Sequence, residues 1–234
     1  MNRKNILHID SSARSGHSDT DRHGSHTRRL SRQFIREWQR LRPDDHITHR
    51  DIGFEPPAPV TGGWIAAAFT PPNLRDEAMH AILRESDHLT TELVQADLLV
   101  VGMPMYNFGV PAQLKAWIDN VVRVGVTFGF DRSRNGEPYW PMLPPGKHLI
   151  ILTSRGDYGY APGERLASMN HAEAGLKTPL TYLGLTESKT IAIEYDEFGD
   201  ERLQTSIRSA EVEVIRLAKE TAAMFGLHPF GHCA

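Results

Sequence analysis

The sequence predicts an α/β fold: an open sheet of five parallel strands with helices on both faces. Five short apolar segments alternate with longer segments whose apolar residues recur every three or four positions, as on one face of a helix. Two of the short segments, 96–102 and 148–153, are apolar at consecutive positions, which is typical of parallel strands buried on both faces. The 234 residues contain no internal repeat or low-complexity linker, so we expect a single domain over 1–234.

The first half of the chain supplies three of the expected strands. Residues 5–9 form the first, closed by the polar Asp10-Ser11-Ser12, and a helix over 28–41 follows it. The apolar face of that helix consists of Leu30, Phe34, Trp38 and Leu41. Residues 46–51 form a second strand, polar enough to lie at a sheet edge, whereas 96–102 forms the clearest strand and belongs in the centre.

Proline interrupts the pattern between these two strands. The segment 53–72 contains five of the chain's 15 prolines. We expect a loop or flap there, because proline removes a backbone donor and is poorly tolerated inside regular elements. The remaining expected elements are a helix over 74–95, a helix over 111–124, strands over 148–153 and 187–194, and a long helix over 201–225.

The charge is nearly balanced overall but uneven along the chain. Lys and Arg number 26 and Asp and Glu 29, a net charge of -3, which excludes nucleic-acid binding through bulk positive charge. Residues 1–50 nevertheless hold 11 basic residues against 6 acidic ones, a local net of +5. This excess is either a solvated helix face or part of a site for an anionic ligand, with Arg14 and Arg28 as the candidate contacts.

Cysteine usage points to the cytoplasm. Cys233 is the only cysteine, so the chain cannot form an internal disulfide, which favours a reducing compartment. No apolar run reaches the roughly 18–20 residues that span a bilayer, and residues 1–12 lack the apolar stretch of a signal peptide. The histidines, including His228 and His232, show no metal-ligand spacing with carboxylates, so we expect no catalytic metal.

Ligands of open parallel sheets bind at the carboxyl ends of the strands, which singles out three loops. In the first, Ser25 and Thr27 stand where a helix should begin, and helix N-termini bind anions. A capping role for Ser25 explains it equally well. Ser18 and Thr20 are rival hydroxyls, but the acidic residues beside them would repel a phosphate. Neither a nucleoside-triphosphate P-loop nor a Gly-x-Gly-x-x-Gly fingerprint is present.

The other two loops favour a flat aromatic ligand. The second, 103–111, holds two methionines, a tyrosine and a phenylalanine, and the third, 153–160, holds Arg155, Gly156 and two tyrosines. Taken alone, the second loop could be a local hydrophobic plug, and the third could be an ordinary glycine turn. Together, phosphate donors, an aromatic cradle and close backbone approach at one sheet edge favour flavin mononucleotide (FMN).

A family resemblance is carried mainly by residues 105–128. The motifs are Met105-Tyr106-Asn107-Phe108, Gln113-Leu114-Lys115, Trp117-Ile118-Asp119 and Arg123-Val124-Gly125-Val126-Thr127-Phe128, with Ser154-Arg155-Gly156 and the opening Ser-Ser-x-Arg. They resemble the FMN-dependent NADH:quinone oxidoreductases, also called azobenzene reductases, and the similarity runs with gaps over almost the whole chain. It implies a flavodoxin-like fold, noncovalently bound FMN and a homodimer.

Carried over by position, the resemblance also implies a set of contacts. The phosphate contacts would be Ser12, Ser25, His26 and Thr27. The isoalloxazine contacts would be Met105, Tyr106, Asn107, Phe108, Ser154, Arg155, Gly156 and Asp157. Phe128, and Tyr182 from the other subunit, would lie near the substrate face of the ring, and Tyr158 is a further candidate for the substrate pocket.

The chain departs from the family pattern at two places. Its phosphate loop is longer by the segment 15–23, and we match Ser25 rather than Ser18 because the helix over 28–41 must follow it. Asp157 and Tyr158 stand where many members have a glycine and a histidine, so we expect no histidine to donate a proton there.

The resemblance implies an oxidoreductase that passes a hydride from NADH or NADPH to the flavin and then to a quinone or azo compound, in two (ping-pong) steps. We expect no obligatory acid–base side chain, because the cofactor carries the chemistry. The alternative is a flavodoxin-type electron carrier without its own substrate turnover, although flavodoxins are typically shorter and strongly acidic. A hydrolase is disfavoured, since Ser154 has no evident His and Asp partners and no Gly-x-Ser-x-Gly elbow is present.

Overall fold

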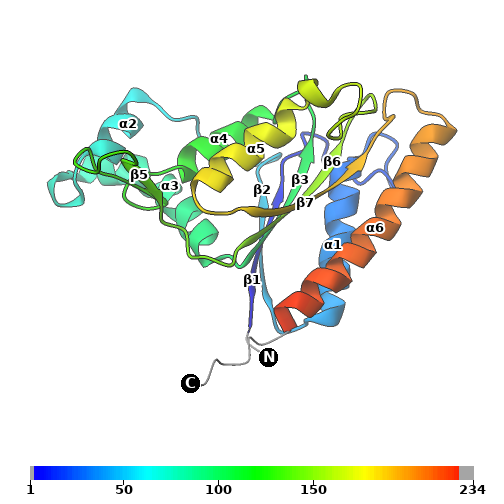
Figure 1. The fold of residues 1–234 in the computed structure, drawn as a ribbon, viewed down its shortest axis with the longest axis horizontal. Coiled ribbons are helices and arrows are strands. Elements are labelled where there is room, and N and C mark those ends of the chain that lie inside the picture. The colour runs from blue at the N-terminus through cyan, green and yellow to red at the C-terminus, as the bar shows by residue number, and fades with distance from the viewer. Residues whose placement is uncertain (1–2, 227–234) are drawn as a thin grey trace.

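The centre of the protein is a five-stranded sheet in the order β2-β1-β3-β6-β7, seen in a computed structural model that describes residues 3–226. Each neighbouring pair of strands is parallel. The strands are β1 (Asn5–Asp10), β2 (His46–Asp51), β3 (Leu98–Pro104), β6 (His148–Ser154) and β7 (Glu187–Ile193). The expected parallel sheet is confirmed, with the polar β2 at an edge and β3 in the centre (Figure 1).

Helices cover both faces of this sheet (Figure 1). They are α1 (His26–Leu41) and α6 (Glu201–Gly226) on one face, and α3 (Glu77–Gln95), α4 (Ala112–Val121) and α5 (His171–Tyr182) on the other. Every residue of β3 is buried between the two layers. This explains its continuous apolar sequence, because such a strand has no face toward solvent. None of the helices within the described residues is long and apolar enough to cross a membrane.

The expectation of a loop throughout 53–72 is wrong in part, because α2 (Gly62–Phe69) lies within it. The prolines of this segment all lie outside the helix, so they restrict its ends and not its interior. The Thr61 side chain caps α2 by accepting a hydrogen bond from the Trp64 N–H. The buried alanines of α2 then pack against Leu83 of α3 as a small core of their own.

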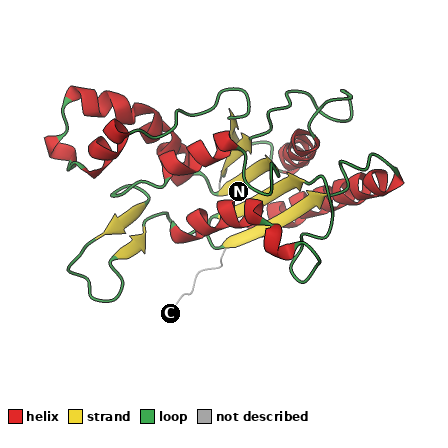
Figure 2. Cartoon of the chain, turned by 90° about the horizontal axis from the view of Figure 1, so that it is seen from above, coloured by secondary structure: helices red, strands yellow, loops and turns green. Residues whose placement is uncertain are grey.

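Several elements have no counterpart among the sequence expectations. α5 contains Gly175 and Pro179, which weaken its helical signal. β4 (Phe128–Phe130) and β5 (Tyr139–Pro141) form an antiparallel hairpin, which lies apart from the five-stranded sheet in Figure 2. Strands of three residues are too short for an alternating pattern to identify them. The other short elements are the 3-10 turns η1 (Pro72–Leu74) and η2 (Ala167–Met169).

The order of strands places three loops at one edge of the sheet. The chain runs from β1 outward to β2 and then crosses back to β3, so the order of the strands reverses between β1 and β3. The N–H of Ser11 donates to the carbonyl of Gly102 at 3.0 Å, and the N–H of Met105 donates to the carbonyl of Ser154 at 2.9 Å. The loops that follow β1, β3 and β6 are therefore tied together where parallel sheets bind ligands.

Candidate functional site

The loop after β3 contains a strained two-residue turn. The N–H and carbonyl of Tyr106 exchange hydrogen bonds with those of Gly109, at 3.1 and 3.0 Å, which leaves Asn107 and Phe108 in the turn. Both have positive φ, 47° and 67° respectively. For residues other than glycine, this left-handed conformation is unfavourable by roughly 1–2 kcal/mol. The turn leaves Phe108 exposed at the carboxyl edge of the sheet, and strain of this kind is concentrated at functional sites.

Backbone donors accompany this turn. The N–H groups of Asn107, Phe108 and Gly156 donate no hydrogen bond within residues 3–226. A methyl group on Gly156 would lie 2.4 Å from Oε1 of Glu197, so the loop after β7 approaches this glycine closely. Free N–H groups on a rigid loop can bond the heteroatoms of a flat ligand.

A polar cavity of about 180 Å³ lies where the loop after β1 meets the N-terminus of α1. Its lining residues are Ser12, Arg14, Ser25, His26, Pro104, Met105, Tyr106, Ser154, Gly156, Asp196 and Glu197. Ser25 caps α1, because its Oγ accepts a hydrogen bond from the Arg28 N–H at 3.2 Å. The capping role is thus confirmed, and the same hydroxyl borders the cavity, whereas Ser18 does not.

His26 is held from both sides of its ring. Nδ1 lies 2.8 Å from Oγ of Ser18, and Nε2 lies 3.1 Å from Oδ1 of Asp196. The hydrogen bond from His26 lowers the pKa of Asp196, although burial of the carboxyl group opposes this. Nη1 of Arg14 lies 3.8 Å from the same carboxylate. The cavity therefore combines phosphate donors with two carboxylate side chains, Asp196 and Glu197.

A second cavity, of about 330 Å³, adjoins the polar one. Met105, Gly156 and Glu197 line both. The remaining lining residues of the second cavity are Asn107, Phe108, Asp157, Tyr160, Leu166 and Met169. Hydroxyls, a guanidinium and an imidazole at one end, with aromatic and aliphatic walls at the other, suit a ligand with a phosphate and a flat ring.

Arg28 does not line the polar cavity. Its guanidinium makes two 2.6 Å hydrogen bonds to the carboxylate of Asp51 and donates to the carbonyls of Ser12 and Arg14, at 2.9 and 2.7 Å. Burial lowers the pKa of Arg28, but the hydrogen bonds to Asp51 together with the negative charges of Asp10 and Asp51 leave the pKa raised. Arg28 thus holds the backbone of the first loop, and of the two expected arginines only Arg14 borders the cavity.

Two other residues assigned by resemblance lie behind the cavity walls. The side chain of Arg155 is buried and forms ion pairs with Glu173 and Glu194. Thr27 is buried, with Oγ1 3.0 Å from Oγ of Ser25. Tyr106, by contrast, borders the polar cavity, and its hydroxyl accepts a hydrogen bond from the N–H of Ala13 at 3.2 Å.

The candidate substrate residues divide into two aromatic groups. Tyr158 borders neither cavity: its ring stacks on Tyr195 with centroids 4.7 Å apart. Phe128 and Tyr182 lie outside both cavities and pack on each other at 5.4 Å. The hairpin aromatics Phe130 and Tyr139 adjoin them, and we call these four residues the aromatic surface. Tyr139 and Tyr182 are 49% and 41% exposed.

Sequence reasoning did not find Met169, Asp196 or Glu197, and it placed Tyr160 in the third loop without assigning it a contact, although all four line a cavity. Asp196 and Glu197 follow β7, whose carboxyl end reaches the same sheet edge as β6. The available signal was that these residues directly follow the expected strand over 187–194, whose loop was not among the three singled out. His228, His232 and Cys233 lie outside the described residues.

Comparisons with known proteins identify relatives of this chain. A family model described as a flavodoxin-like fold matches residues 4–217. The FMN-dependent NADH:quinone oxidoreductase 2 of Idiomarina loihiensis is 40% identical over 215 residues, which are 92% of this chain and 89% of that protein. The FMN-dependent NAD(P)H:quinone oxidoreductase 1 of Pseudomonas aeruginosa is 42% identical over 196 residues, 83% of this chain and 92% of that protein.

Solved structures show the same fold. An azoreductase from Bacillus anthracis has a TM-score of 0.80 at 20% identity, covering 93% of this chain and 99% of its own. An FMN-dependent NADH-azoreductase from the same species, solved in complex with FMN, has a TM-score of 0.79 at 16% identity, covering 94% and 99%. The two relatives at about 40% identity and the family model together show that the chain belongs to the flavodoxin-like family of the FMN-dependent NADH:quinone oxidoreductases.

Proposed function

We propose that the protein is an FMN-dependent oxidoreductase that uses NADH or NADPH to reduce quinones and azo compounds. The observation that carries this proposal is the pair of adjoining cavities at the carboxyl ends of β1, β3 and β6, one lined by hydroxyls, a guanidinium and an imidazole and the other by aromatic, aliphatic and polar groups together. The printed names of relatives at about 40% identity, FMN-dependent NADH and NAD(P)H:quinone oxidoreductases, support the same activity.

The polar cavity fits the phosphate of FMN. Hydroxyls of Ser12 and Ser25 can donate to phosphate oxygens, and Arg14 adds positive charge. His26 lies beside them with its ring nitrogens bonded to Ser18 and Asp196, so it would exchange one of these partners to contact the phosphate. The cavity also meets the N-terminus of α1, whose first N–H groups and dipole favour an anion. Thr27 supports this end indirectly through its contact with Ser25.

The second cavity fits the isoalloxazine ring. Met105 and Phe108 offer apolar contact, and the N–H groups of Asn107 and Gly156 can bond ring heteroatoms. Asp157 borders this cavity, and Ser154 borders the adjoining polar one. FMN, when bound, supplies hydride acceptance and donation. The chain's own contribution is to hold the ring, exclude water from one face and leave the other accessible, so we assign no residue the role of obligatory acid or base.

A single accessible face implies that the nicotinamide donor and the acceptor use the same place in turn, which is a two-step (ping-pong) reaction.

The exposed aromatic surface supports a homodimer in which Tyr182, with Phe128 packed on it, borders the partner's substrate site. Exposed aromatic rings gathered on one side of a protein are typical of an interface.

The absorbance spectrum of the purified protein tests the cofactor. We expect the bands of oxidised flavin, their bleaching by NADH or NADPH without oxygen, and their return on adding a quinone. A protein that binds no FMN on reconstitution would contradict the proposal. Steady NADH oxidation with a quinone separates an enzyme from an electron carrier, because a carrier without its own turnover would need a separate reductase.

A further inference from the structure

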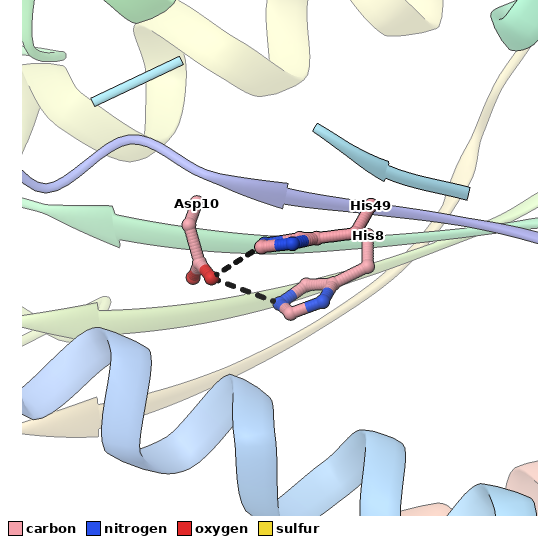
Figure 3. A group of neighbouring side chains, drawn as sticks. All are labelled: His8, Asp10 and His49. Carbon is pink, nitrogen blue, oxygen red and sulfur yellow. Dashed lines mark hydrogen bonds and ion pairs between the residues drawn. The ribbon is translucent and has the colours of Figure 1, made fainter. Parts of the chain in front are cut away.

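Two histidines and an aspartate converge at the edge of the sheet, outside both cavities (Figure 3). Oδ2 of Asp10 lies 3.0 Å from Nε2 of His49 and 3.3 Å from Nε2 of His8. The two imidazole rings are stacked with centroids 4.4 Å apart and an angle of 24° between them. One ligand atom from each of the three residues lies within 4.8 Å of the others.

The register of the two edge strands creates this cluster. His8 of β1 is the direct neighbour of His49 of β2 in the parallel pair. Asp10 lies two residues after His8, so its side chain points to the same face of the sheet. The 40 residues that lie between His8 and His49 correspond to no metal-binding spacing, which is why no sequence motif reveals the cluster.

We propose that His8, Asp10 and His49 bind one divalent transition-metal ion of the Zn²⁺ class. Two imidazoles and a carboxylate are a ligand set that suits Zn²⁺, whereas Mg²⁺ and Ca²⁺ prefer oxygen alone. Ligand distances of about 2.0–2.2 Å put neighbouring ligand atoms of a tetrahedral ion roughly 3.3–3.6 Å apart. The 3.0 and 3.3 Å separations are close to those edges. Because two stacked rings cannot both direct an in-plane lone pair at one ion, the half-exposed His49 ring would turn out of the stack on binding, and water can complete the fourth position.

Nε2 of His8 has only one weak partner within residues 3–226. It is buried, and its 3.3 Å contact with Oδ2 of Asp10 does not have the geometry of a good hydrogen bond. A metal ion would give this buried ring nitrogen a stronger partner. Asp10 is fixed for such a role, because the hydroxyl of Ser31 donates to its Oδ1 at 2.8 Å and leaves Oδ2 facing the imidazoles.

The local charge also accommodates a cation. The guanidinium of Arg28 lies 3.8 Å from Oδ2 of Asp10, but it is bonded by two 2.6 Å contacts to Asp51. One positive charge thus faces two carboxylates, which leaves a net negative charge for a divalent ion to neutralise. An ion at this site would join edge strand β2 to β1 just before Ser11 and Ser12, and would stabilise the fold without entering the redox reaction.

Zinc titration of the FMN-loaded, chelator-treated full-length protein tests the site. We expect calorimetry to show one site that binds Zn²⁺ at one ion per chain. His49→Ala should weaken the zinc affinity of this site by at least about tenfold, because replacing even a residue that only hydrogen-bonds to a metal ligand lowers metal affinity about 10–100-fold. His46→Ala is the matched control: His46 is also exposed on β2, but its side chain forms a hydrogen bond with Thr48 and lies outside the cluster, so its replacement should leave the zinc site unchanged.

A second readout is thermal unfolding with and without Zn²⁺. Zinc should raise the Tm of the unaltered protein and of His46→Ala, and raise it much less in His49→Ala, since an ion that binds only the folded state stabilises it by mass action. Equal zinc binding by the unaltered protein and His49→Ala would overturn the proposal, and so would the absence of a stoichiometric site. His49 is exposed, so its replacement leaves the core intact.

Discussion

The imidazole of His26 and the carboxylate of Asp196 are 170 positions apart in sequence and lie 3.1 Å apart in the fold, between Nε2 and Oδ1. His26 begins α1, and Asp196 follows β7 at the far edge of the sheet. The pair closes one side of the polar cavity. Asp196 orients His26, a candidate contact of the FMN phosphate, and also places a negative charge beside the expected phosphate position. Replacing Asp196 therefore tests which of these two effects dominates.

Asp196→Asn should strengthen FMN binding. The amide retains the shape of the carboxyl group but removes a charge that repels the phosphate, and two charges about 4 Å apart in water interact by roughly 1 kcal/mol, or about fivefold in Kd. Titration of the FMN-free protein by calorimetry measures this, and high salt should reduce the gain. Asp200→Asn is the control, because Asp200 pairs with the exposed Arg202. Weaker FMN binding by Asp196→Asn would show that orienting His26 matters more than charge.

Arg28→Met should destabilise the FMN-free protein by at least about 2 kcal/mol, because it leaves Asp51 and two carbonyl groups without a charged donor. Urea unfolding gives the free energy directly. Arg29→Met, at the next position of α1, removes a partly exposed ion pair with Glu211 and should cost less than about 1 kcal/mol. Similar losses from the two variants would contradict the role assigned to Arg28 in holding the first loop.

Phe108→Gly should separate stability from binding. Glycine relieves the positive φ of this position, worth about 1–2 kcal/mol, against a backbone entropy cost of about 0.5–1 kcal/mol. We therefore expect the FMN-free protein to become more stable by up to about 1 kcal/mol, while FMN binding weakens through loss of an aromatic wall. Phe54→Gly is the control, since Phe54 is exposed without positive φ and should lose stability. A less stable Phe108→Gly variant would show that the turn is unstrained.

Tyr182→Ala should raise the KM for quinone by about 2- to 10-fold, corresponding to about 0.5–1.5 kcal/mol of aromatic contact, and leave FMN affinity unchanged. The reason is that Tyr182 lies on the aromatic surface, outside both cavities of its own chain. Steady-state kinetics and FMN titration measure the two effects. Phe69→Ala, which removes an exposed ring from α2, is the control. A Tyr182→Ala variant that loses FMN would place this residue in the cofactor site instead.

The sequence alone predicted the sheet because its signals are local. The continuous apolar run of β3 places it in the centre, and the polar β2 belongs at an edge. The capping role of Ser25 was one of two readings that the sequence left open. By contrast, α2 was hidden by prolines that flank it, and α5 was hidden by its own Gly175 and Pro179.

Only the tertiary structure decided which side chains meet. It directed Arg28 to Asp51 rather than into the polar cavity, Arg155 to Glu173 and Glu194, and Asp196 to His26. It also set His8 beside His49. These contacts depend on strand order and register, which join distant positions, whereas periodicity and capping describe neighbours within a few residues. The sequence therefore determined the fold and the edge of the sheet that carries the candidate site, and the packing of that edge determined which residues line it.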